Sequence, residues 1–77
     1  MTRNKSKLKK AIERSRLEIE NLERKLSRSQ VAIIEAIISQ TKPSDAEVKY
    51  FRTYAALIDV ERENLQKLVA ELESLGL

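Results

Sequence analysis

The chain has 77 residues, a net charge of +3, and no cysteine, histidine or tryptophan. A chain this short forms at most one small domain. Without cysteine or histidine, it offers no ligands for a zinc finger or an iron–sulfur cluster, no disulfide framework and no imidazole acid–base catalyst. The single glycine, Gly76, excludes a phosphate-binding glycine loop. We therefore expect a non-enzymatic protein with no catalytic residues, no metal, no cofactor and no small-molecule substrate.

No apolar run approaches the roughly 18 residues that a membrane-spanning helix needs. The longest runs from Val31 to Ile38 and is interrupted by Glu35. The sequence also shows no pattern of a secretory signal. We expect a cytoplasmic protein with no membrane span.

The first expected helix covers about residues 5–40 and carries an apolar seam along its whole length. The spacing within this seam alternates between three and four residues, which is typical of a coiled coil. One line of the seam contains Ile12, Ile19, Leu26 and Ile33, and the other contains Leu8, Ser15, Leu22, Ser29 and Ala36.

A break is expected at residues 41–44, because Pro43 disfavours helical geometry in the residue before it. Ser44 and Glu47 then have the spacing of a capping box, which predicts that a second helix starts at Ser44 and runs over about residues 44–75. Gly76 predicts the stop of this helix in a left-handed conformation, with Leu77 returning to contact Leu72.

A loop this short favours an antiparallel return, so the fold class is all-α, a coiled-coil-like two-helix hairpin forming a single domain over residues 1–77. Two registers fit the pattern. If paired residue numbers sum to 84, Leu22 faces Arg62; if they sum to 87, the row of Tyr54, Glu61 and Leu68 turns inward and Ile19 faces Leu68. Pro43 and the capping box argue against the alternative of one long dimerising rod.

The helices carry more apolar surface than a lone hairpin buries, and small chains without a disulfide or a metal usually need a partner. We therefore expect a four-helix bundle, completed by a homodimer or by a helical protein partner. The residues expected at this interface are Val31, Ile34, Ile37, Ile38, Tyr50, Tyr54, Leu57 and Leu68.

Charge is distributed unevenly along the chain. Residues 1–30 hold ten basic and four acidic side chains, whereas residues 31–77 hold five and eight. Two interpretations stay open for the basic start. It could contact an anionic partner through Arg3, Lys5, Lys7, Lys9 and Lys10, or it could pair across the hairpin with Glu61, Glu63, Glu71 and Glu73.

The sequence thus favours a protein–protein interaction module of the adaptor, co-chaperone or inhibitor type. Its surplus apolar helix surface would pack on a helical partner or on a second copy. The alternative is a small dimeric nucleic-acid-binding regulator that uses the basic N-terminal segment.

Overall fold

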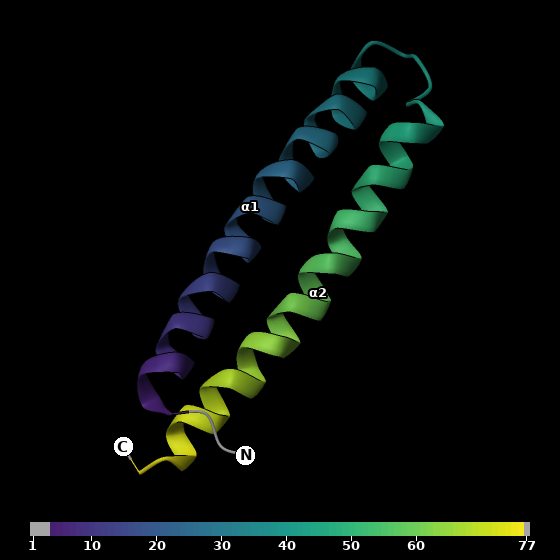
Figure 1. Cartoon of the computed structure of the whole chain (residues 1–77). Helices are drawn as coiled ribbons and strands as arrows, with labels where there is room; N and C mark the ends of the chain where they lie inside the picture. Colours follow the sequence, from purple (N-terminus) through teal and green to yellow (C-terminus); the bar gives the residue numbers. More distant parts are fainter. Residues whose placement is uncertain (1–3, 77) are drawn as a thin grey trace.

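The computed structural model describes residues 4–76, which form two antiparallel helices, α1 (Lys5–Ile38) and α2 (Asp45–Ser74), joined by a turn at one end (Figure 1). The hairpin measures 56 × 15 × 15 Å. The expected all-α hairpin is confirmed. Neither of the two described helices combines the length and the apolar character needed to cross a membrane.

Helix α1 begins at a side-chain cap. The Oδ1 atom of Asn4 accepts a hydrogen bond of 2.8 Å from the backbone N–H of Lys7. This bond satisfies one of the four amide groups that have no partner inside a helix at its start. The predicted start of the helix at about residue 5 is confirmed, and Asn4 is a cap that the prediction did not include.

Helix α1 ends at Ile38, two residues earlier than expected, because Gln40 adopts a left-handed conformation with φ of 58°. The N–H of Gln40 donates to the carbonyl of Ile37 at 3.0 Å, and the N–H of Thr41 donates to that of Ala36 at 2.8 Å. These two bonds form a Schellman motif, which more often has glycine at the left-handed position.

The predicted start and stop of α2 (Asp45–Ser74) are confirmed. Ser44 is the N-cap, and its Oγ accepts a hydrogen bond of 3.1 Å from the N–H of Glu47. At the other end, Gly76 has φ of +83° and donates its N–H to the carbonyl of Glu73 at 3.2 Å. The expected contact of Leu77 with Leu72 lies outside the described residues.

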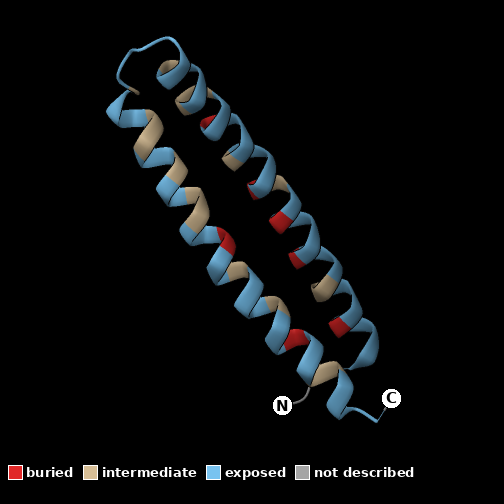
Figure 2. Ribbon diagram, turned by 180° about the vertical axis from the view of Figure 1, so that it is seen from behind, coloured by how far each residue is buried: buried red, intermediate tan, exposed pale blue. Residues whose placement is uncertain are grey.

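The core is a single seam between α1 and α2. Both predicted lines of α1 face it, and Leu8 is the most completely buried residue. Figure 2 shows that the buried segments face the opposite helix and avoid the turn. The buried residues are Leu8, Ser15, Ile19, Leu22, Ser29, Ile58 and Leu68.

Three side-chain contacts between the helices define the register. The Oγ atom of Ser15 donates to Oε1 of Glu61 at 2.8 Å. The guanidinium of Arg62 lies 3.6 Å from the carboxylate of Glu23, and Nζ of Lys25 lies 6.0 Å from the ring centre of Tyr54. The residue numbers in these pairs add to 76, 85 and 79, so the helices are aligned around a sum of about 80.

Both registers left open by the sequence are therefore wrong. They would place Ser15 opposite Val69 or Leu72, which are about 12 and 16 Å along the helix from Glu61. The inward row is nevertheless that of the second register, since Leu68 is buried while Arg62 and Val69 are exposed. The observed alignment differs from the second register by seven residues, which is one heptad. Because a shift by one heptad presents the same face of each helix, the apolar pattern cannot distinguish these two alignments.

Candidate interaction surface

The two halves of the hairpin differ in how far their seam is closed. We define the loop half as residues 30–57 and the terminal half as the described residues on either side, 4–29 and 58–76. All buried residues lie in the terminal half, and every residue of the loop half is at least partly exposed (Figure 2). Even the seam residues Ile33 and Phe51 are only half-buried. The loop half therefore lacks a closed core of its own.

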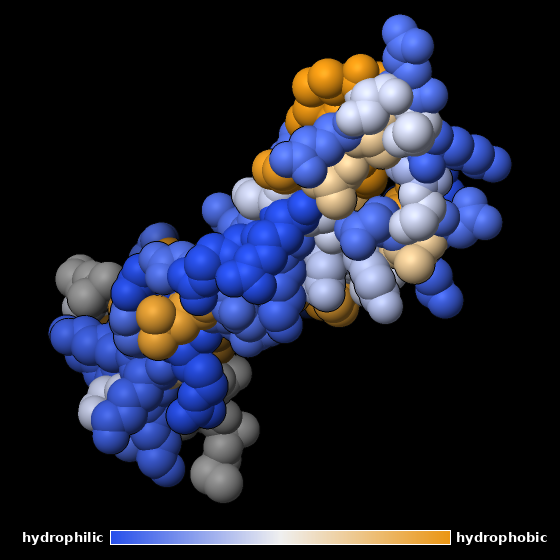
Figure 3. All heavy atoms as spheres, turned by 90° about the horizontal axis from the view of Figure 1, so that it is seen from above, coloured by the Kyte–Doolittle hydropathy of each residue, from blue (hydrophilic) through white to orange (hydrophobic). Residues whose placement is uncertain are grey.

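The outer face of α1 in the loop half is apolar. Val31, Ile34 and Ile38 follow one another at intervals of three and four residues, so they form one stripe, with Ile37 beside it. Val31 is 53% exposed and Ile38 is 75% exposed. We call these four residues the α1 stripe. Figure 3 shows apolar side chains gathered at the loop end, whereas polar ones dominate the end that carries the termini.

A second apolar face lies on α2. Tyr50 and Leu57 are exposed at equivalent heptad positions, and Val60 is 63% exposed one turn beyond Leu57. We call these three residues the α2 stripe. Val60 is absent from the predicted interface, although its spacing of three residues from Leu57 indicates the same face of the helix. Two rings are stacked here, those of Tyr50 and Tyr54, with centres 6.3 Å apart.

Two predicted interface residues are placed differently from the others. Leu68 is buried in the seam, so the expectation that it contacts a partner is corrected. It lies inside because the observed register turns its row toward α1. Tyr54 is half-buried, between the seam and the stacked ring of Tyr50.

The two stripes lie on opposite flanks of the hairpin. Glu23 and Lys25 are two residues apart on α1, so they point about 200° apart around its axis. Glu23 contacts α2 on one flank, and Lys25 reaches Tyr54 on the other. Ile37 shares its heptad position with Glu23, so the α1 stripe belongs to the first flank. The ring stacking of Tyr50 on Tyr54 assigns the α2 stripe to the second.

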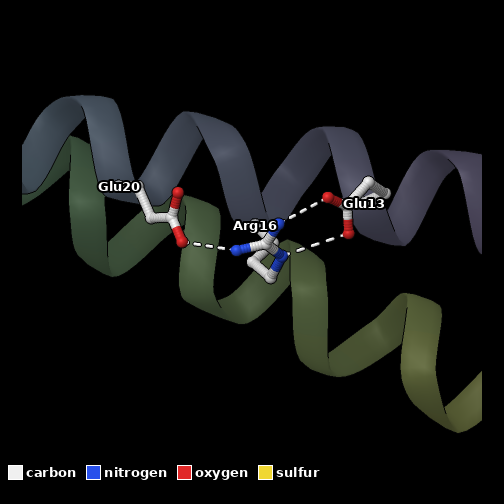
Figure 4. A network of polar contacts seen from close by, with 3 residues as sticks. All are labelled: Glu13, Arg16 and Glu20. Atoms are coloured by element: carbon white, nitrogen blue, oxygen red, sulfur yellow. Dashed lines mark hydrogen bonds and ion pairs between the residues drawn. The ribbon is translucent and has the colours of Figure 1, made fainter.

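The outer face of α1 in the terminal half is charged. Arg16 lies between two carboxylates, those of Glu13 and Glu20, and contacts both (Figure 4). Its Nε donates to Oε2 of Glu13 at 3.1 Å. The hydrogen bond from Arg16 lowers the pKa of the Glu13 carboxyl below its usual range, and the same bond raises the pKa of Arg16. This face satisfies its own charges while remaining in contact with water.

The basic start of α1 is exposed at Lys5, Lys7, Lys9 and Lys10. Within residues 4–76, none of these lysines forms an ion pair with a carboxylate. Arg3, the fifth residue expected to contact an anionic partner, lies outside the described residues.

The expected pairing of basic residues with the acidic end of α2 is not formed at two of the four glutamates. Glu61 accepts hydrogen bonds from Ser15 and, at 3.4 Å, from Asn64. Glu63 instead pairs with Lys67 of its own helix, at 3.8 Å. Each carboxylate has thus found a nearer partner than the lysines at the start of α1.

Among the described residues, no group of histidine, cysteine, aspartate and glutamate side chains is arranged to hold a metal ion. The described surface of the hairpin offers apolar stripes and charged faces. Comparisons of the chain with protein-family models, with curated proteins and with solved structures found no match.

Proposed function

We propose that this protein is a non-enzymatic interaction module that docks the α1 stripe on a helical surface. The observation that carries the proposal is the open core of the loop half, where no residue is buried. A helix that shows apolar residues on both its inner and its outer face is suited to lie between two neighbours. In this hairpin, α2 supplies one neighbour of α1, and the docked partner would supply the other.

The energetic argument rests on exposed branched aliphatic side chains. Burying one such side chain contributes about 1.5–3 kcal/mol, and the α1 stripe has four of them. Single exposed apolar residues are common on proteins that act alone, but contiguous ones mark interaction sites. Leu17, which is 51% exposed among charged neighbours, is an isolated residue of the first kind.

Site-specific photo-crosslinking tests the proposal, and Leu17 provides the matched control. A photoreactive amino acid is placed at position 38 or at position 17, and the chain is irradiated in its native cells. We expect a defined protein adduct from position 38 and none from position 17. Equal adducts at the two positions, or none at position 38, would contradict the proposed docking face. The mass of the adduct shows whether the partner is a second copy or another protein.

A second candidate function is contact with a nucleic acid through the start of α1. The exposed lysines without carboxylate partners favour it, because such groups can neutralise phosphates. Replacing Lys7, Lys9 and Lys10 with glutamine should reduce affinity for a DNA or RNA duplex and flatten its dependence on salt. The matched control replaces Lys42 and Lys49, near the turn. An unchanged salt dependence in the first variant would remove this candidate.

A further inference from the structure

We propose that the partner of the α1 stripe is a second copy of this chain, with the two α1 helices packed antiparallel about a two-fold axis near Ile34. This inference rests on the proposed function, since it names the occupant of the same face. It predicts a dimer in which only the loop halves overlap. The terminal halves would then extend in opposite directions.

The charge distribution favours a copy over a different protein. Residues 30–41 of α1 and the turn contain one charged side chain, Glu35, whereas residues 5–29 contain thirteen. The whole loop half holds three acidic and three basic residues, so its net charge is zero. Two copies can therefore bring these halves together without like-charge repulsion. A face with so little charge also carries no complementary pattern that would select a charged partner.

The same distribution favours the antiparallel arrangement. In each copy, the terminal half together with the chain ends carries the whole net charge of +3. A parallel dimer would place these charged halves side by side, with the face of Arg16 directed at its own copy. An antiparallel dimer separates them at opposite ends, and only the neutral loop halves meet.

The α1 stripe is also self-complementary when one copy is reversed. Val31, Ile34 and Ile38 are spaced by three and then four residues, and in an antiparallel copy the same residues are spaced by four and then three. The two stripes can therefore lie against each other with apolar residues at both ends and in the middle. With the two-fold axis near Ile34, Val31 of one copy lies level with Ile38 of the other. Uncharged polar residues flank the stripe and would form the rim of the interface, as in many protein interfaces. They are Ser27, Gln30, Ser39 and Thr41.

The dimensions of the hairpin define the expected strength of the dimer. Half of its length by its full width is about 28 by 15 Å, or about 400 Å² per copy, below the 800 Å² per partner of a standard interface. We therefore expect a reversible dimer with a Kd of micromolar order. Its length should be about 80 Å, because two hairpins of 56 Å overlap over one half of each.

The first test is the mass of the purified full chain in sedimentation over a concentration series, together with small-angle scattering. We expect the mass to rise toward twice 8.9 kDa and the maximum dimension to approach 80 Å. Ile34→Lys and Ile38→Lys should each weaken the dimer by about 100-fold while helicity is retained. The matched controls Leu17→Lys and Val60→Lys should leave the mass unchanged. A dimer that resists both stripe substitutions, or whose length is only about 56 Å, would overturn the proposal.

Cysteine cross-linking tests the arrangement directly, because the natural chain has no cysteine. In the antiparallel dimer, Ile34→Cys lies near the axis and should form a disulfide with its copy in oxidised glutathione. Ile38→Cys should not, because its copies lie about 10 Å apart along the helices, too far for a disulfide. Mixing the Ile38→Cys and Val31→Cys chains should restore cross-linking. Strong self-cross-linking at both positions 34 and 38 would indicate a parallel dimer and refute the inference.

The two proposals can fail separately. A native chain that stays monomeric up to about 1 mM excludes the second copy as partner, since even weak specific complexes form at that concentration. If position 38 still yields an adduct with a different protein in cells, the docking function stands and only its occupant changes. If position 38 yields no adduct of any kind, both proposals fail.

Discussion

The terminal half and the loop half are built on the same heptad pattern, yet the terminal half buries residues as far out as Leu8 and Leu68, while the loop half buries none. The outer face of α1 also differs between the two halves, and the half that buries fewer apolar residues in the seam exposes more of them on this face. Where the seam is closed, the outer face of α1 carries the ion pairs of Arg16; where the seam is open, it carries the α1 stripe. The seam alone therefore does not distinguish the two halves. The outer face of α1 does, because it is charged where two helices close the core and apolar where they leave it open.

The largest expected effect compares two isoleucines on the same line of the seam. Ile19 is buried in the terminal half, and Ile33 is half-buried two heptads away in the loop half. Ile19→Ala should lower the free energy of unfolding by about 2–4 kcal/mol, because it leaves a cavity in a closed core. Ile33→Ala should lower it by less than half as much. Urea denaturation followed by circular dichroism in dilute solution measures both, and equal losses would show that the halves are closed alike.

The next effect compares two buried serines, also two heptads apart. Ser15 donates to the partly buried carboxylate of Glu61, whereas Ser29 makes no hydrogen bond to α2. Ser15→Ala should therefore cost about 1–2 kcal/mol, since it removes a charge-assisted bond, while Ser29→Ala should be nearly neutral. The same denaturation assay separates them.

The Ser15 variant also tests the register. If the hydrogen bond selects the observed alignment, Ser15→Ala combined with Glu61→Leu replaces both of its partners with apolar residues and allows a slip by one heptad. Distances between spin labels on α1 and α2 would then show more than one population. A single unchanged distance would mean that the loop, and not this hydrogen bond, determines the register.

The ends of the helices give a smaller effect, with opposite signs at the two ends of the hairpin. Gln40 has a positive φ, which disfavours residues with a Cβ atom, so Gln40→Gly should stabilise the hairpin by about 0.5 kcal/mol after the greater chain entropy of glycine is considered. Gly76→Ala should destabilise it by about 1 kcal/mol. A Cβ atom there would meet no neighbour, so the cost comes from the backbone alone. Thermal unfolding monitors both, and a destabilised Gln40→Gly would contradict this account of the turn.

The sequence was sufficient for the features that depend on local chemistry. Pro43, Ser44 and Gly76 each act through their own backbone or side chain, so the existence of a break and the start and stop of α2 could be predicted, whereas α1 ends two residues earlier than expected. The register could not be predicted, because a shift by one heptad presents the same apolar face of each helix, and the hydrogen bond that marks the observed alignment joins residues 46 positions apart. Leu68 is buried because the structure turns its row of α2 inward, a choice between two rows that the sequence left open.

The exposed faces were partly predictable as well. The four residues of the α1 stripe were anticipated from surplus apolar positions, and the structure shows all four exposed. The ion pairs were harder to predict, because one carboxylate has several basic side chains within reach, on its own helix and on the other one. Glu63 selects Lys67 of its own turn over the distant lysines of α1, because a partner four residues away is held close by the helix itself.

The smallest effect concerns the charged face of the terminal half. The hydrogen bond from Arg16 lowers the pKa of Glu13, so the folded state favours the ionised carboxylate. This contribution to stability is present above the pKa of Glu13 in the unfolded chain and is lost as the pH falls through the lower pKa of the folded state. A carbon-13 NMR titration of Glu13 should show its midpoint rising in the Arg16→Gln variant.

Salt provides the matched control for that titration, because Glu13 and Arg16 are exposed and their attraction is screened by ions. High salt should bring the native midpoint toward that of the variant. A midpoint that responds to neither salt nor Arg16→Gln would mean that the ion pairs of this face do not persist in solution. The charged side chains of this face would then be solvated individually, without lasting ion pairs. The difference between the two halves would in that case consist only in how many apolar residues each half buries.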